Sequence, residues 1–207
     1  MNGGYEDGYR SCACFWGTEP GRLVKQVATL LGDVQRLDVL DAGCGEGKNT
    51  AFLAKRGARV RAFDISTTAI EHARMFLGDP ANASLEVADV RKCELPESNY
   101  DIVIAYGLLH CLASQAEVTV VLERLKLATK AGGLNVICSF NDRQQDLSAH
   151  PGFIPVLLEH SQYTSFYSDW QLLYQSDEDL TEVHPHNGIR HTHSMTRLIA
   201  KRCTITT

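Results

Sequence analysis

The chain has 207 residues, 44% of them hydrophobic and 22% charged, which suits one globular domain with a sizeable core. Its net charge of −5 and the lack of a basic tract argue against nucleic acid as a partner. No apolar run reaches the ~18 residues of a membrane helix, and the first ten residues lack the apolar core of a secretion signal. Seven irregularly spaced cysteines indicate reduced thiols, so we expect a cytoplasmic protein with no membrane partner.

Predicted helices and strands alternate along most of the chain, which is typical of a parallel sheet with helical crossovers. The predicted helices cover residues 20–31, 48–55, 67–77, 116–129 and 154–159. The predicted strands cover residues 38–42, 60–65, 84–87, 101–106, 134–140, 169–174 and 189–201. The pattern therefore indicates an α/β protein.

Residues 39–47 form the most informative stretch, in which an apolar strand containing Asp41 runs into Gly43, Gly45 and Gly47. Glycine allows a sharp turn and lets a ligand approach the backbone closely. A loop between a strand and a helix is also where nucleotide-like cofactors bind in open α/β sheets. The dinucleotide fingerprint is G-x-G-x-x-G, and Lys48 stands where its third glycine would be. This spacing disfavours a nicotinamide oxidoreductase.

Asp64 ends the next predicted strand, 23 residues after Asp41. That distance is near the ~20-residue spacing of a carboxylate that accepts hydrogen bonds from ribose hydroxyls. The alternative is that Asp64 caps the helix that begins at about Ser66. Because the glycine loop lies upstream, we favour ribose binding.

Residues 38–140 resemble the class I S-adenosylmethionine-dependent methyltransferases in several segments. The D-x-G-x-G-x-G loop at 41–47 is similar to motif I of that family, E-V-A-D-V at 86–90 to its adenine-edge motif, and Y-D-I-V-I-A-Y at 100–106 to its motif IV. The L-L-H-C segment at 108–111 is similar to the segment beside the methyl donor. T-K-A-G-G at 129–133 resembles the K-P-G-G turn, with Ala131 in place of proline.

This resemblance implies a single-domain, Rossmann-like, doubly wound fold, whose mostly parallel seven-stranded sheet has an antiparallel C-terminal strand. The domain would span residues 1–207, with an N-terminal lid and helix at 1–35, a cofactor-binding core at 38–140 and an acceptor-side region at 141–207. The implied cofactor is S-adenosyl-L-methionine, and Asp89 would accept a hydrogen bond from its adenine amine. The implied cofactor-binding residues are Asp41, Gly43, Cys44, Gly45, Gly47, Asn49, Asp64, Ile65, Asp89, Val90 and Tyr106.

The C-terminal third resembles a narrower group, the tellurite-resistance (TehB-like) methyltransferases. The similar segments are D-W-Q-L-L-Y at 169–174, E-V-H at 182–184, G-I-R at 188–190 and R-L-I-A-K-R at 197–202. In that family a histidine and two arginines have roles at the acceptor side. His184 and Arg190 match two of them, and Pro185 stands in place of the other arginine. The resemblance implies His184 and Arg190 as catalytic residues, while His110 is either a base or a structural residue near the cofactor.

Asn187-Gly188 is a strong signal for a two-residue hairpin turn. With a type I′ turn there, four histidines would share one strand face, namely His184, His186, His191 and His193. Imidazole suits several transition metals. However, no cysteine or carboxylate completes a familiar ligand spacing, and methyl transfer needs no metal. We therefore expect these histidines to form a pocket wall and expect no metal. The Cys12–Trp16 segment is expected to pack as part of the lid.

The predicted function is S-adenosylmethionine-dependent methyl transfer to a small-molecule acceptor. A soft nucleophile is the leading class: a tellurite- or selenite-like oxyanion, a thiol or a selenol. Holding nucleophile, methyl carbon and sulfur in line can lower the barrier by about 7–11 kcal/mol. One alternative is a natural-product O- or N-methyltransferase, and another is a non-catalytic sensor or partner domain that binds the cofactor. The sequence does not determine the oligomeric state and is compatible with a homodimer.

Overall fold

A computed structural model of the chain describes residues 5–78, 80–183 and 188–204. Its strands are β1 Asp38–Ala42, β2 Arg59–Asp64, β3 Ala83–Val87, β4 Tyr100–Tyr106, β5 Thr129–Gln145, β6 Gln171–Val183 and β7 Arg190–Lys201. Its helices are α1 Glu6–Ser11, α2 Arg22–Leu31, α3 Lys48–Ala54, α4 Thr67–Leu77, α5 Gln115–Ala128 and α6 His160–Ser165, with a 3₁₀ turn, η1, at Leu109–Cys111.

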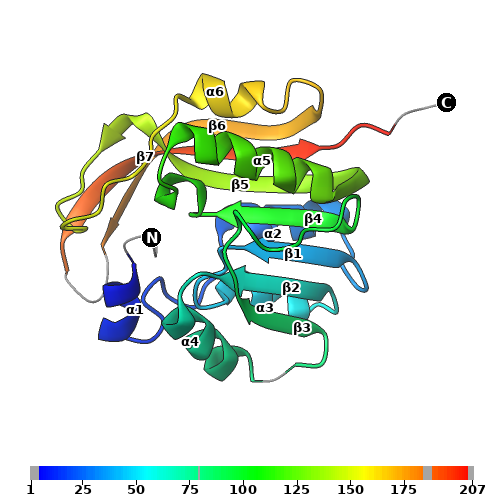
Figure 1. Ribbon diagram of the computed structural model, residues 1–207, viewed down its shortest axis with the longest axis horizontal. Helices are drawn as coiled ribbons and strands as arrows, with labels where there is room; N and C mark the ends of the chain where they lie inside the picture. The colour runs from blue at the N-terminus through cyan, green and yellow to red at the C-terminus, as the bar shows by residue number, and fades with distance from the viewer. Residues whose placement is uncertain (1–4, 79, 184–187, 205–207) are drawn as a thin grey trace.

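The strands form one seven-stranded sheet in the order β3-β2-β1-β4-β5-β7-β6 (Figure 1). Neighbours from β3 to β5 pair in parallel, whereas β7 is antiparallel to both β5 and β6. This topology confirms the predicted α/β fold with an antiparallel C-terminal strand. None of the described helices is long and apolar enough to cross a membrane.

The sheet lies between two layers of helices, with α2 and α3 behind it and α5 and α6 in front (Figure 1). Alternate residues of β4 pack against the two helix layers in turn, because successive side chains of a strand point to opposite faces. Ile102 and Ile104 belong to the apolar cluster that includes Leu23 of α2, whereas Val103 belongs to the cluster that includes Leu122 of α5. Both faces of the central strands are therefore buried, which explains their continuous apolar sequence.

The helix predicted at 154–159 is wrong. Apart from Leu158, which bridges to Asn141, these residues lie in neither a helix nor a strand, and α6 begins only at His160. Pro155 has no backbone N–H to donate within a helix, and it disfavours helical geometry in the residue before it. The backbone N–H of Glu159 instead donates to the Gln162 side chain at the start of α6.

The C-terminal strands are longer than predicted, since β5 continues to Gln145 and β6 to Val183. The register pairs Val183 with Arg190, so residues 184–189 separate the last paired residues. The pairing of His184 with His191 that a two-residue turn would give is wrong, because His191 pairs with Glu182. His184 and His186 themselves lie outside the described residues.

Buried hydrogen bonds join α6 and the turn after it to β5. One of these bonds provides a test of the fold. The Tyr167 hydroxyl, in a side chain that is 1% exposed, donates to Asn135 Oδ1 at 2.9 Å. Tyr167→Phe would leave this buried oxygen without its partner, so we expect the free energy of unfolding to fall by about 1–3 kcal/mol. Urea denaturation measures the change.

Tyr174→Phe is the matched control, because the Tyr174 hydroxyl accepts from Arg22 in an exposed contact. We expect that substitution to cost less than about 0.5 kcal/mol. Equal losses of stability in the two variants would contradict the role given to the Tyr167 hydroxyl.

Candidate active site

A cavity opens at the carboxyl ends of β1, β2 and β4, which is where ligands bind in open α/β sheets. Nine of the eleven predicted cofactor-binding residues lie on its wall: Gly43, Cys44, Gly45, Asn49, Asp64, Ile65, Asp89, Val90 and Tyr106. Asp41 and Gly47 do not lie on the wall. Further lining residues come from the N-terminal segment and from β5, β6 and β7, far away in the sequence.

The glycine loop needs a backbone that other residues rarely adopt. Gly43, Gly45 and Gly47 have φ values of 68°, 54° and 79°, which glycine reaches without steric cost. The backbone N–H groups of Gly43 and Cys44 donate to the carbonyl of Phe63, at the end of β2. The loop is thus held against the neighbouring strand with its backbone facing the cavity.

Asp64 connects this loop to the start of α4. One carboxylate oxygen accepts from Gly45 N and the other from Ser66 N, both at 2.9 Å. The N-cap of α4 is Ser66, whose hydroxyl accepts from Ala69 N. Asp64 therefore supports the turn before the helix, while its side chain also lines the cavity. Burial raises the pKa of Asp64, although the backbone hydrogen bonds act against this shift.

Asp41 lies beneath the loop, with 1% of its surface exposed. Its carboxylate accepts from the Thr50 hydroxyl of α3 at 2.6 Å, and burial raises its pKa to about 6. Gly47 occupies the N-cap of α3, where a Cβ would meet the side chains of Leu77 and Ala73. These two residues shape the loop from behind the cavity wall.

Asp89 stands on the cavity wall beyond β3. Its carboxylate accepts from Nε and a terminal nitrogen of Arg91, and this hydrogen bonding lowers the pKa of Asp89. Arg91 also contacts both carboxylate oxygens of Glu117. The arginine is therefore engaged by two carboxylates, and Asp89 presents an ionised side chain.

The N-terminal segment closes one side of the cavity. Glu6 accepts from the hydroxyls of Ser66 and Thr68, which ties α1 to α4. Farther along, Cys14 N donates to Glu46 and Lys48 Nζ donates to the carbonyl of Trp16. The side chains this segment adds to the wall are Tyr5, Tyr9 and Trp16. Sequence reasoning predicted a lid but did not single out its two tyrosines.

His110 is fully packed beside the cavity. Its ring stacks on Phe140 at 4.0 Å between centroids, and its Nδ1 accepts from the Phe140 backbone N–H at 3.2 Å. Burial lowers the pKa of His110 to about 3. The ring is therefore neutral near pH 7 with one nitrogen already occupied, which favours the structural alternative over the role of a base.

Of the two residues matched to the acceptor signature, the structure describes only Arg190. Arg190 is exposed at the start of β7 and does not line the cavity. His184 lies outside the described residues. The carboxylate on this side is Glu182, which lines the cavity with Leu180 and whose pKa is raised by burial. Sequence reasoning missed both as wall residues because the polar second half of β6 was not predicted as a strand.

Comparisons with known proteins agree with this geometry. Residues 39–133 match the methyltransferase domain family. The probable S-adenosyl-L-methionine-dependent methyltransferase TehB of Haemophilus influenzae is 25% identical over 171 residues, which cover 79% of this chain and 57% of TehB. The chain therefore spans little more than half the length of that relative. The crystal structure of TehB superposes with a TM-score of 0.74 at 21% identity, covering 88% of this chain and 62% of that one.

Two further solved structures share the fold. One of them concerns the conversion of a disulfide bond into a thioacetal group during echinomycin biosynthesis. It superposes with a TM-score of 0.74 at 23% identity, and the match covers 100% of this chain and 94% of the other. The magnesium protoporphyrin IX methyltransferase of Synechocystis PCC 6803, with bound S-adenosylmethionine, has a TM-score of 0.62 at 16% identity, covering 96% and 80%.

The cavity fits S-adenosylmethionine in its chemistry. Carboxylates at Asp64 and Asp89 suit hydroxyl and amine donors, and the space that a Cβ at Gly107 would fill is open. The loop also offers backbone without side chains, as close approach of a ligand requires. The chain thus matches the methyltransferase domain family over residues 39–133, is similar to TehB over most of its length, and has a cavity whose chemistry fits S-adenosylmethionine as the cofactor.

Proposed function

We propose that the chain transfers a methyl group from S-adenosylmethionine to a small molecule with a soft sulfur or selenium nucleophile. The observation that carries this proposal is the chemistry of the acceptor-side wall. Most of its described side chains are aromatic or apolar, namely Tyr5, Trp16, Phe140, Leu180 and Met195, and the polar ones among them are Lys48, His110 and Glu182. Such a wall suits a neutral or weakly acidic organic acceptor and excludes water around it.

The cofactor side would be organised by three features. Asp64 would accept from the ribose hydroxyls and Asp89 from the adenine amine. The backbone at Gly43 to Gly45 would admit the amino-acid portion of the cofactor. When bound, the cofactor supplies an electrophilic methyl group on a positively charged sulfur. The chain then has to position the acceptor atom in line with that methyl group, which is chiefly a matter of orientation.

A soft nucleophile needs little help from a base, and the described wall offers little. His110 is neutral with Nδ1 occupied by the Phe140 N–H. Glu182 is the carboxylate on the acceptor side, and we propose that it takes the proton of a thiol or selenol acceptor. A phenol or an amine would require stronger proton removal, so an O- or N-methyltransferase is the less favoured alternative.

The wall is poorly suited to a small inorganic oxyanion such as tellurite. Among the described lining residues the guanidinium is that of Arg91, which is already held by Asp89 and Glu117. The Lys48 ammonium donates to the Trp16 carbonyl, and burial lowers its pKa. Arg190 is exposed away from the cavity. We therefore favour an organic thiol or selenol over the oxyanion that the TehB-like resemblance suggests.

Turnover with labelled S-adenosylmethionine tests the proposal. The acceptor panel contains alkyl and aryl thiols, a selenol, a disulfide-containing cyclic peptide, tellurite, a phenol and an amine. We expect labelled product first with the thiols or the selenol and much less with tellurite. Faster methylation of the phenol or amine would contradict the soft-acceptor assignment. Cofactor binding without turnover on any acceptor would instead favour the sensor alternative.

Asp64 provides a test of the cofactor side. Asp64→Ala removes the proposed ribose acceptor, so affinity for S-adenosylhomocysteine should fall by about 10- to 100-fold, or about 1.5–3 kcal/mol. Isothermal calorimetry measures this affinity. Asp169→Ala is the control, because Asp169 pairs with Lys126 on the surface, away from the cavity. Unchanged affinity in a folded Asp64→Ala protein would restrict Asp64 to supporting the turn.

Gly43 tests the need for bare backbone in the loop. An added Cβ would lie 2.9 Å from Leu108 Cδ1, and both residues line the cavity. Gly43→Ala should therefore weaken cofactor binding by at least about tenfold, or ~1.4 kcal/mol. Gly78→Ala is the matched control, since Gly78 has a similar φ of 65° and open space around it. Both variants share the backbone strain, so equal cofactor affinities would refute a specific role for Gly43.

Glu182 tests the acceptor side. Glu182→Gln keeps the shape of the side chain but removes its basicity, so kcat/KM for a thiol should fall by about 10²-fold or more with cofactor affinity unchanged. Glu178→Gln, on the same strand but paired with Arg22 outside the cavity, should turn over normally. Normal turnover by Glu182→Gln would remove it from the proposed mechanism.

A further inference from the structure

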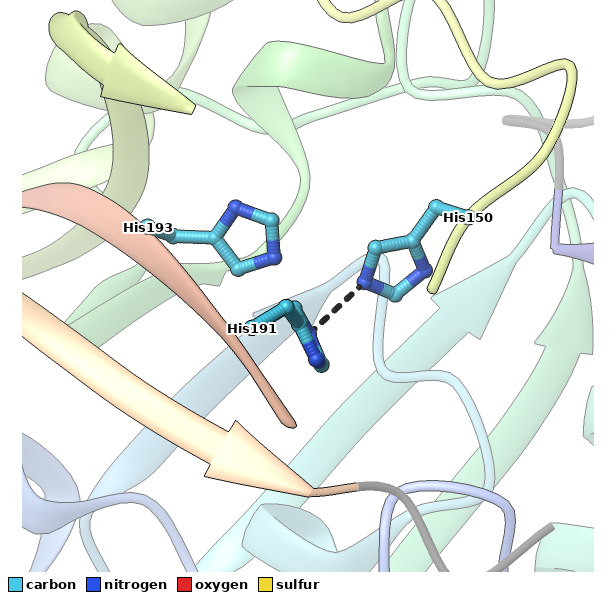
Figure 2. Close-up of side chains that lie close together, drawn as sticks. All are labelled: His150, His191 and His193. Carbon is cyan, nitrogen blue, oxygen red and sulfur yellow. Dashed lines mark hydrogen bonds between the residues drawn. The ribbon is translucent and has the colours of Figure 1, made fainter. Parts of the chain in front are cut away.

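Three buried histidines from two separate segments converge (Figure 2). His191 and His193 alternate on β7, and His150 comes from the loop that follows β5. They are 2%, 0% and 7% exposed, and one ring nitrogen of each lies within 4.8 Å of the other two. Buried imidazoles that converge in this way can act as a set of metal ligands.

The hydrogen bonds of His191 and His193 determine which nitrogen carries the proton. His191 Nδ1 lies 3.0 Å from the carbonyl oxygen of Ile189, which can only accept, so Nδ1 is the protonated nitrogen. His193 Nδ1 lies 2.8 Å from Gln145 Oε1. The amide nitrogen of Gln145 donates to the carbonyls of Asn141 and Ser194, which establishes Oε1 as the acceptor. Each ring therefore carries a proton on Nδ1, and its neutral form has the lone pair on Nε2.

This arrangement is the usual one for metal-bound histidine, in which the nitrogen that does not bind the metal donates to a carbonyl or carboxylate. Such outer partners set the tautomer and the orientation of the ring. Here a backbone carbonyl serves His191 and a side-chain amide serves His193. The two rings are thus already in the state in which a metal ion would bind them.

The spacing of the nitrogens also suits a small cation. His150 Nε2 and His191 Nε2 lie 3.3 Å apart in a hydrogen bond (Figure 2), which His150 donates because His191 carries its proton on Nδ1. A metal ion would take the place of this bridging proton. Two ligands of a tetrahedral zinc ion, at bond lengths of about 2.0–2.1 Å, are separated by about 3.3–3.4 Å. The 4.8 Å span of the whole set has to contract by about 1.4 Å for His193 to join, which is within reach of a side-chain rotation.

The cluster borders the cavity directly. The ring of His193 stacks on Phe140 at 4.1 Å, and His191 Nε2 lies 3.7 Å from Glu182 Oε1. Phe140 and Glu182 both line the cavity. Three protein ligands leave the fourth position of a zinc ion for water or substrate, as in catalytic zinc sites.

We propose that His150, His191 and His193 bind one divalent transition-metal ion of the zinc type, with an open coordination position toward the acceptor side of the cavity. Sequence analysis argued against a metal because no cysteine or carboxylate completes a familiar ligand spacing near the hairpin and because methyl transfer needs no metal. His150 completes the set from a distant loop. The use of the ion rests on the proposed function: a thiol acceptor in the open position would bind as the thiolate and release its proton to Glu182 or to water.

Metal titration of untagged, metal-free protein tests the site without cofactor or acceptor. Zn²⁺ is titrated in competition with a chromophoric chelator, and Co²⁺ is added separately to follow its visible absorption, which is intense in four-coordinate sites. We expect one ion per chain, bound more tightly than micromolar. His150→Ala and His191→Ala should each weaken binding by at least about 100-fold. His160→Ala is the matched control, because His160 contacts Thr196 outside the cluster and should bind normally.

Gln145 supplies a second variant in case a ligand substitution prevents folding. Gln145→Leu removes the acceptor of the His193 Nδ1–H and should weaken Zn²⁺ binding by about 10–100-fold. Thermal melting of each metal-free variant verifies folding. The proposal is overturned if the wild type binds Zn²⁺ no better than folded His191→Ala, or more weakly than micromolar. A chain that binds zinc but methylates no thiol would retain the site and refute only the proposed function.

Discussion

The pair of hydrogen bonds from Gly45 and Ser66 to the Asp64 carboxylate is the constraint on which the cofactor side depends. It fastens the glycine loop of β1 to the end of β2 and to the start of α4. Because the loop has positive φ at three positions, only glycine allows this geometry without strain. The result is a rigid edge at which backbone and one carboxylate face the cavity, with Asp41 holding α3 from below through Thr50.

Much of this cofactor side could be predicted because its signals are local. The strand, the glycines and the following helix are adjacent in the chain, and Asp64 ends the next strand. The bounds of α4 were predicted correctly because a serine cap precedes it and Gly78 ends it. What could not be foreseen is which residues face inward. Asp41 lies under the loop and not on the cavity wall, because Thr50 draws its carboxylate toward α3.

The acceptor side was harder to predict because it is assembled from distant segments. Tyr5 and Trp16 reach it from the N-terminus, Phe140 from β5 and Glu182 from a strand whose polar sequence resembles a loop. That part of β6 is stabilised by pairing with β7, which local propensity does not reveal. The same pairing sets the hairpin register, and so Arg190 lies exposed where the family signature suggested an acceptor-side role.

These features describe a methyltransferase-like domain in which most residues matched to the cofactor motifs line one cavity, whereas Arg190, matched to the acceptor signature, lies outside it. The wall is aromatic, lacks a free described guanidinium, and is bordered by three buried histidines. The difference is consistent with the proline at 185, where the TehB-like pattern has an arginine. An acceptor site of this kind would favour an acceptor with a soft nucleophilic atom and a complementary shape over an acceptor with a negative charge.

A crystal structure of the chain with S-adenosylhomocysteine and a thiol acceptor tests the central claim most directly. The account predicts ribose hydroxyls on Asp64, the adenine amine near Asp89, and the acceptor sulfur between the cofactor and Glu182. A nucleoside bound away from the Gly43–Gly45 loop, or an acceptor on the opposite side of the cofactor from Glu182, would contradict it.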